Sequence, residues 1–197
     1  KGFTFSYKGY AHMQSQIAGE CQRENLATAL EVIDSLKKLG YQITEEAVRA
    51  GINATRWAGR FTCLSEDPVV IVDGAHNEDG VEKFVETAEH FQKECPLTLL
   101  FSAVDDKDYT DMIHTICSRI TFRHVVVTSV GGYREVPAER FAKLFTEAGA
   151  KSVEAVEDIE QAFARALEAK GDDGMLFCVG SLYLVGEIKD VIRRNKK

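Results

Sequence analysis

A cluster of polar side chains follows an apolar run in the first half of this 197-residue chain. The run Val69 to Val72 is continuous and rich in β-branched residues, which is typical of a strand buried on both faces. Gly74 then allows a sharp turn, so we expect Asp73 and His76 at the carboxyl end of that strand. Open parallel sheets bind ligands at this edge. Asp73 can accept a ribose hydroxyl or hold an arginine. His76 can donate a hydrogen bond to a carboxylate or phosphate, and a structural hydrogen bond is its ordinary alternative.

Other polar residues follow further apolar runs, so we expect them at the same carboxyl edge of the sheet. Lys107 stands between two aspartates, where its ammonium can bind a carboxylate, although such a segment is often only a solvated turn. Ser181 opens the last helix, where its hydroxyl and the neighbouring amides can bind an anion or simply cap the helix. We expect Asn77 to cap the helix that follows it. Arg134 lies in a loop after two glycines.

A second group of candidate residues lies upstream. Gln22 and Asn25 are one helical turn apart, so both can face a flat ligand such as adenine, and capping is the ordinary alternative. Arg60 carries a planar, permanently charged group suited to phosphate oxygens. The ordinary alternative for Arg60 and Asp73 is a surface ion pair.

Apolar runs and amphipathic helical patterns alternate from Val69 onward, which predicts a mainly parallel sheet of five to six strands with helices on both faces. The expected fold is therefore α/β, doubly wound and Rossmann-like. The predicted strands are Val69–Asp73, Leu97–Ala103, His124–Ser129, Val153–Val156 and Met175–Val179. The predicted helices are Glu78–Gln92, Tyr109–Arg119, Ala138–Ala148, Ile159–Lys170 and Leu182–Arg194.

The first part of the chain is predicted to be a small α+β segment of two strands and two helices. The helices are expected at Gln22–Leu39, closed by Gly40, and at Thr44–Ile52. Helical periodicity stops between Arg56 and Asp67, so we place domains at 1–57 and 58–197. Because the chain starts without methionine and inside a strand-like pattern, we interpret it as a fragment. So short a first segment has little core of its own, and we expect it to leave an apolar face that favours self-association.

The composition is that of an ordinary globular protein, with 45% hydrophobic and 28% charged residues. A formal net charge of −7 gives no general attraction to nucleic acid or anionic membrane. No apolar stretch approaches the roughly 20 residues that cross a bilayer. The five cysteines form no CxxC pair and are interpreted as reduced core residues of a cytoplasmic protein.

The segment Asp73-Gly74-Ala75-His76-Asn77 resembles the signature of folylpolyglutamate synthases, which are ATP-dependent ligases related to the muramyl peptide ligases. Four more segments keep the order and approximate spacing of that bifunctional folylpolyglutamate and dihydrofolate synthase family: Gly19-Glu-Cys-Gln22-Arg-Glu-Asn25, Trp57-Ala-Gly-Arg60-Phe61, Asp106-Lys107-Asp108 and Gly180-Ser181-Leu182-Tyr183-Leu184. The chain departs from the family pattern at Cys21, Ala58 and Tyr133. Together the segments cover nearly the whole chain, which resembles the C-terminal part of such a ligase.

The resemblance implies residue roles. It assigns Asn25 and Gln22 to adenine, and Arg60 and Asp73 to ATP. It also assigns His76, Lys107, Ser181 and Arg134 to the substrate, with His76 and Lys107 as the catalytic residues.

The resemblance also implies a reaction. In such a ligase ATP, with Mg²⁺, phosphorylates the terminal carboxylate of a reduced folate or folylpolyglutamate, and the amine of L-glutamate attacks the acyl phosphate. The sequence contains no G-x-x-x-x-G-K-[ST] motif, so the phosphate cradle and most metal ligands are expected in a missing N-terminal domain of the same polypeptide. We therefore predict that the isolated chain is inactive.

Two alternatives stay open at this point. The chain can belong to a muramyl peptide ligase, although Gly74 favours the folate branch. It can also be a non-catalytic module that binds nucleotides or other proteins.

Overall fold

The computed structural model describes residues 2–17, 21–57, 59–130 and 132–195, apart from the side chain of Cys21. These residues form two compact units, Lys1–Arg60 and Phe61–Lys197, which we call unit 1 and unit 2. The sequence had placed a boundary between residues 57 and 58. Each unit is described by itself.

Unit 1 contains a hairpin and two helices. Strand β1 (Phe3–Tyr7) pairs antiparallel with β2 (Tyr10–Ser15), and helices α1 (Cys21–Lys38) and α2 (Glu45–Ala54) follow. Thr44 caps α2, because its side chain accepts a hydrogen bond from the backbone N–H of Ala47 at 3.1 Å. Gly40 has a φ of +97°, the left-handed conformation that commonly ends a helix, as expected from the sequence. A small apolar core joins the hairpin to both helices: Tyr10, Met13, Leu26, Leu30, Val48 and Ile52.

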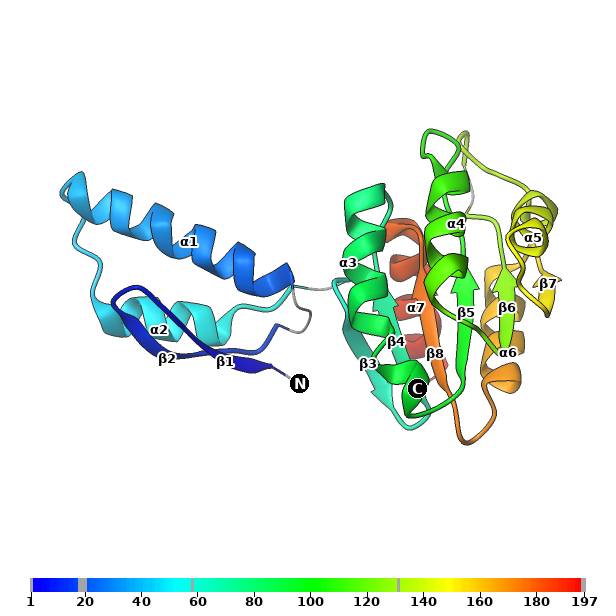
Figure 1. Cartoon of the computed structure of the whole chain (residues 1–197), viewed down its shortest axis with the longest axis horizontal. Coiled ribbons are helices and arrows are strands. Elements are labelled where there is room, and N and C mark those ends of the chain that lie inside the picture. The colour runs from blue at the N-terminus through cyan, green and yellow to red at the C-terminus, as the bar shows by residue number, and fades with distance from the viewer. Residues whose placement is uncertain (1, 18–20, 58, 131, 196–197) are drawn as a thin grey trace. The chain divides into compact units, whose positions relative to one another are not determined.

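Unit 2 is built on a six-stranded sheet in the order β3-β4-β8-β5-β6-β7. The strands are β3 (Thr62–Glu66), β4 (Val69–Asp73), β5 (Leu97–Phe101), β6 (His124–Val127), β7 (Val153–Ala155) and β8 (Met175–Val179). All neighbours pair parallel except β3, which is antiparallel to β4. The arrowheads of β5 and β6 point to the same end of the sheet in Figure 1. The expected mainly parallel fold is confirmed.

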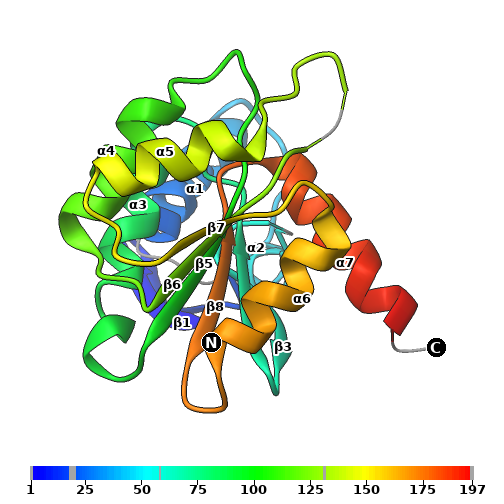
Figure 2. The same ribbon diagram turned by 90° about the vertical axis from the view of Figure 1, so that its right-hand side faces the viewer.

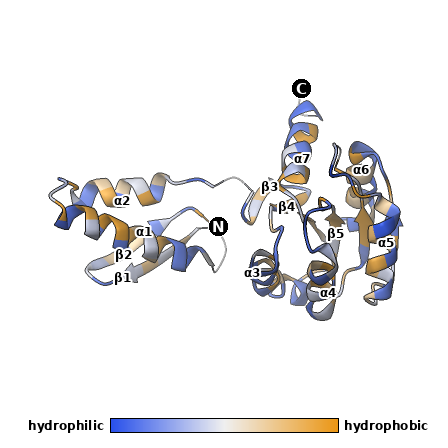
Figure 3. Ribbon diagram, turned by 90° about the horizontal axis from the view of Figure 1, so that it is seen from above, coloured by the Kyte–Doolittle hydropathy of each residue, from blue (hydrophilic) through white to orange (hydrophobic). Residues whose placement is uncertain are grey.

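Helices cover both faces of this sheet. The helices are α3 (Glu78–Ala88), α4 (Tyr109–Arg119), α5 (Ala138–Glu147), α6 (Ile159–Lys170) and α7 (Leu182–Asn195), and a 3-10 turn, η1, spans Phe91–Lys93. Figure 2 shows α3, α4 and α5 on one side of the strands and α6 and α7 on the other. Two apolar clusters fill the two layers, because successive strand residues such as Leu99 and Leu100 point to opposite faces. Figure 3 shows hydrophobic and hydrophilic residues alternating along these helices, as expected of helices with one buried face.

Three details differ from the sequence prediction. Strand β3 was missed, because its five residues show no apolar run and occupy the sheet edge, where one side of the ladder faces no strand. The helix predicted to run to Gln92 ends at Ala88, and η1 follows. Strands β5 and β6 end two residues earlier than predicted, at Phe101 and Val127, because the segments beyond them leave the ladder. The other helix and strand boundaries given in the sequence analysis agree within two residues.

The cysteines are not all core residues. Cys178 is buried, Cys95 and Cys117 are partly buried, and Cys63 is exposed on β3, so its interpretation as a core residue was wrong. Within the described residues, no helix is long and apolar enough to span a membrane.

Candidate functional site at the carboxyl edge of the sheet

The register of the sheet brings the ends of four strands into one row. Asp73 of β4 pairs with Val179 of β8, Val179 pairs with Phe101 of β5, and Phe101 pairs with Val127 of β6. The segments that carry His76, Ser181, Lys107 and Arg134 leave the sheet just beyond these residues. The four predicted substrate residues therefore lie along one edge, where parallel sheets bind ligands.

Asp73 organises the backbone at the end of β4. Its carboxylate is buried, 6% exposed, and accepts the N–H of Phe61 at Oδ2 and the N–H of Ala75 at Oδ1, both at 2.8 Å. These bonds hold both segments that flank the predicted site. Asp73 thus has a structural function in unit 2, and its predicted contact with ATP stays a prediction.

His76 lies on the segment between β4 and α3 and is partly buried. Its Nδ1 lies 2.6 Å from the carbonyl oxygen of Gly74, which can only accept, so Nδ1 carries the proton. In the neutral ring Nε2 is then an acceptor, and in the imidazolium it is a donor. The backbone bond thus fixes the ring so that Nε2 is the nitrogen available for other contacts.

Asn77 caps helix α3, as expected from the sequence. Its Oδ1 accepts the backbone N–H of Gly80 at 2.9 Å. A Cβ atom at Gly80 would lie 2.8 Å from that oxygen, so a side chain there would push the Asn77 amide out of its capping position. The cap orients the segment that holds His76 relative to the sheet.

Ser181 occupies the tight connection between β8 and α7. Its side chain is buried, 2% exposed, and its hydroxyl accepts the backbone N–H of Tyr183 at 3.1 Å, which is the geometry of a helix N-cap. Gly180 before it has a φ of +111°, and a Cβ atom there would lie 2.4 Å from the carbonyl oxygen of Ser102. The backbone at Ser181 is therefore pressed closely against the end of β5. Its hydroxyl hydrogen is still available to a ligand, since the cap uses the oxygen only as an acceptor.

Two cations lie in the loops that follow β5 and β6. Lys107 is partly buried, and among the described residues its ammonium has no hydrogen bond or ion pair. Arg134 donates to Asp106 at 2.7 Å and to the Tyr183 hydroxyl at 2.9 Å. The hydrogen bond to Asp106 raises the pKa of Arg134 further above its ordinary value, so the guanidinium stays charged. The edge thus offers an ammonium, a guanidinium, an imidazole and a hydroxyl, a set suited to carboxylates and phosphates.

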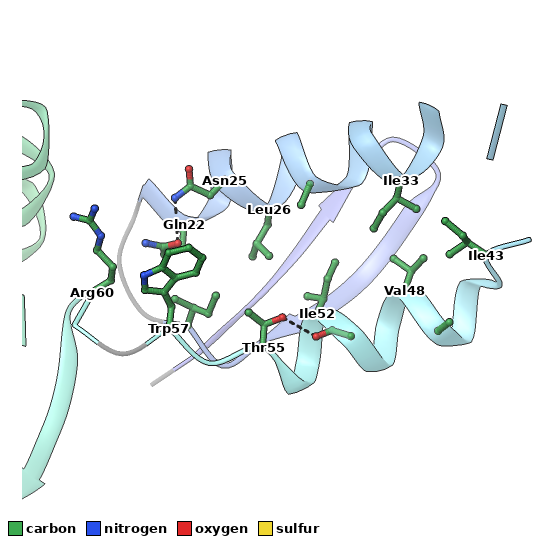
Figure 4. A pocket seen from close by; sticks show the side chains of 14 residues that line it. Gln22, Asn25, Leu26, Ile33, Ile43, Val48, Ile52, Thr55, Trp57 and Arg60 are labelled. Atoms are coloured by element: carbon green, nitrogen blue, oxygen red, sulfur yellow. Dashed lines mark hydrogen bonds between the residues drawn. The ribbon is translucent and has the colours of Figure 1, made fainter. Parts of the chain in front are cut away.

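A second candidate site lies within unit 1, as a cavity of about 620 Å³ between α1 and α2. Figure 4 shows Gln22, Asn25, Trp57 and Arg60 at one end, and aliphatic side chains such as Ile33 at the other. Asn25 donates from Nδ2 to Oε1 of Gln22 at 3.2 Å, so the two predicted adenine residues do lie together. The polar end therefore combines amide groups, an indole and a guanidinium.

Some residues singled out from the sequence lie outside the described part. They are Gly19, the side chain of Cys21, Ala58 and Gly131. Sequence reasoning also missed Tyr183 and Asp106 as neighbours of Arg134, and Trp57 as a lining residue of the unit 1 cavity. Large aromatic side chains that are exposed indicate a role other than core packing, and this exposure can be seen only in the structure. Trp57 is 65% exposed and Tyr183 is 58% exposed.

Comparison with known proteins adds independent findings. Residues 59–182 match the family model described as Mur ligase, glutamate ligase domain. A dihydrofolate synthase/folylpolyglutamate synthase of Bacillus subtilis (strain 168) is 30% identical over 95% of this chain and 44% of its own length. A UDP-N-acetylmuramoyl-L-alanyl-D-glutamate–L-lysine ligase of Streptococcus pyogenes is 29% identical over 85% of this chain and 34% of its own length.

A solved structure gives the same picture. Mycobacterium tuberculosis folylpolyglutamate synthase, complexed with ADP and AMPPCP, is 27% identical with a TM-score of 0.81, over 92% of this chain and 42% of that one. The chain therefore spans less than half the length of the folylpolyglutamate synthases it is compared with.

Proposed function

Because this chain belongs to the Mur ligase glutamate ligase domain family, we propose that it is the C-terminal part of an ATP-dependent ligase that adds glutamate to folates. Similarity to folylpolyglutamate synthases over nearly the whole chain supports this assignment. The observation that carries it is the row of His76, Ser181, Lys107 and Arg134 along one edge of the sheet. Under this proposal, unit 1 belongs to the central ATP-binding domain.

The proposed reaction joins the amine of L-glutamate to a side-chain carboxylate of a reduced folate or folylpolyglutamate. ATP would activate that carboxylate as an acyl phosphate. Lys107 and His76 would neutralise and orient the phosphate and carboxylate oxygens, while Ser181 and Arg134 would bind the incoming glutamate. Such chemistry depends on positioning and charge stabilisation, for which fixed donors at one edge are suited.

The donor groups of unit 1 fit a nucleotide. The amides of Gln22 and Asn25 offer the paired donor and acceptor that an adenine edge needs, and Arg60 offers N–H groups to phosphate oxygens. The contact of Asp73, in unit 2, with a ribose hydroxyl of ATP is part of the same proposal, since a carboxylate accepts hydrogen bonds. We propose that Mg²⁺ would accompany ATP, with its protein ligands mainly in a part of the ligase outside this chain. Among the described residues there is no group of three or more His, Cys, Asp or Glu that could hold a metal.

We propose that the isolated chain does not catalyse the reaction and that the complete ligase acts in the cytoplasm. No G-x-x-x-x-G-K-[ST] motif occurs in the sequence, which supports a phosphate cradle in a part of the ligase outside this chain. A muramyl ligase is the second candidate, because a lysine-adding muramyl ligase is also similar to this chain.

The test is ATP-dependent glutamate addition to a reduced folate, comparing this chain with the complete ligase of the same organism. We expect activity only in the complete protein. His76→Asn in that protein keeps a donor near the Gly74 carbonyl but removes Nε2, so turnover should fall about 100-fold or more with little loss of stability. Activity with muramyl substrates alone would overturn the folate assignment. Nucleotide binding without ligation of either substrate would favour a non-catalytic module.

A further inference from the structure

Arg134 lies where three segments of the carboxyl edge meet. Its Nη1 donates to Oδ2 of Asp106, in the loop after β5, at 2.7 Å. Its Nη2 donates to the hydroxyl of Tyr183, in the first turn of α7, at 2.9 Å. Its own carbonyl oxygen accepts the backbone N–H of Asp105 at 3.0 Å. One residue of the β6–α5 loop therefore joins the segments that follow β5 and β8.

Two tyrosine rings flank the same guanidinium. The guanidinium carbon lies 5.5 Å from the ring centroid of Tyr133 and 5.7 Å from that of Tyr183, within the distance at which an aromatic ring attracts a cation. Tyr133 is 95% exposed, so core packing does not account for its position. The rings and the Tyr183 hydroxyl restrict the orientation of the guanidinium while leaving it accessible.

The contact with Asp106 is of a different kind. It joins one nitrogen to one oxygen, and the two side chains are 29% and 48% exposed. Exposed pairs of this kind are weak, whereas a carboxylate that meets two N–H groups of an arginine in parallel is bound more strongly. An incoming carboxylate can therefore replace Asp106 at low cost.

We propose that Tyr183 is a positioning residue for Arg134, and that Asp106 holds the guanidinium until a carboxylate of the incoming amino acid takes its place. The inference rests on the proposed function for the identity of the amino acid, L-glutamate. Tyr183 and Asp106 then act on the same guanidinium with opposite consequences. Loss of the tyrosine hydroxyl leaves Arg134 less ordered, and loss of the aspartate charge removes a competitor.

The test measures the Kd of L-glutamate for the 197-residue chain by titration calorimetry, in the unaltered chain and in each variant. Where Arg134 is present, NMR with ¹⁵N-labelled arginine also follows the signal of its side chain on addition of L-glutamate. Tyr183→Phe keeps the ring but removes the acceptor, and should raise Kd about fivefold. Asp106→Asn should lower Kd about threefold, the size expected for an exposed ion pair. Arg134→Ala should abolish the effect of both changes. Asp190→Asn, which removes an exposed Arg193 contact of 2.7 Å within α7, is the matched control and should leave Kd unchanged.

If the contacts of Arg134 with Asp106 and Tyr183 only held the loops together, the changes in Kd would differ from those expected above. Weaker glutamate binding in both Tyr183→Phe and Asp106→Asn would overturn the exchange, and an unchanged Kd in Tyr183→Phe would overturn the positioning role. The absence of any glutamate-dependent shift at Arg134 would overturn both. A separate assay distinguishes this inference from the proposed function: if the complete ligase keeps its KM for glutamate after Arg134→Ala, the ligase assignment stands and the inference fails.

Discussion

The carboxylate of Asp73 accepts the backbone N–H of Phe61 at 2.8 Å, so the end of β4 holds the segment that leads into β3. The same carboxylate accepts the N–H of Ala75 at 2.8 Å. One buried side chain thus fixes the backbone on both sides of the candidate site.

We expect Asp73→Ala to destabilise unit 2 by about 2–3 kcal/mol, because it leaves two buried N–H groups without their acceptor. Urea unfolding followed by circular dichroism measures the change. Asp172→Ala, at an exposed loop position, is the control and should stay within about 0.5 kcal/mol. An equally small effect at Asp73 would contradict its structural role.

Gly180 should be intolerant of any side chain. A Cβ atom there would lie 2.4 Å from the carbonyl oxygen of Ser102 and 2.7 Å from the ring of Phe101, and the φ of +111° is strained for other residues. Gly180→Ala should therefore cost about 2 kcal/mol or more in thermal or urea unfolding.

Gly186 provides the matched control within α7. A Cβ atom there meets nothing within 4 Å, so Gly186→Ala should stabilise the helix by about 0.5–1 kcal/mol. If Gly180→Ala and Gly186→Ala changed the free energy of unfolding in the same direction, the close packing at Gly180 would be contradicted.

Burial raises the pKa of the Cys117 thiol from 9.0 to about 11. In the unfolded chain this thiol ionises at lower pH, so its contribution to stability is complete below pH 9 and is lost as the pH rises toward about 11. In Cys117→Ala the free energy of unfolding should fall less steeply with pH between 9 and about 11. Urea unfolding at a series of pH values measures this slope. Cys63→Ala, at the exposed thiol, should leave the slope unchanged.

Trp57 is the single tryptophan of the chain, so its fluorescence reports on the cavity that it lines in unit 1. If this cavity receives adenine, ATP or ADP should change the emission, and Asn25→Ala should raise the concentration required about tenfold through loss of hydrogen bonds. Guanosine nucleotides serve as the control for base recognition. An identical response to adenine and guanine nucleotides would argue against the assigned roles of Gln22 and Asn25.

The aliphatic part of the same cavity predicts self-association of the 197-residue chain. Ala47 and Ala50 are both exposed on α2, but only Ala47 lines the cavity. We expect light scattering to show a mass that rises with concentration, and Ala47→Glu to reduce it because a charge is costly in an apolar contact. Ala50→Glu should have no such effect. A monomer at all concentrations in the unaltered chain would count against the prediction.

The sequence by itself determined the order of elements and the ligand-binding edge. Strand and helix periods are local properties, so the buried run from Val69, the caps at Thr44 and Asn77, and the parallel arrangement follow from neighbouring residues. Polar residues just after apolar strands also mark the carboxyl edge, whatever the order of the strands in the sheet.

Only the tertiary structure decided which of these residues are neighbours. The last strand, β8, enters between β4 and β5, which places Ser181 between the segments of His76 and Lys107, and no local pattern encodes such long-range pairing. The edge strand β3 has too little apolar periodicity to be recognised alone. The contacts of Asp73 with Phe61, and of Arg134 with Tyr183, join residues that are distant in sequence, so their energies depend on packing that exists only in the folded chain.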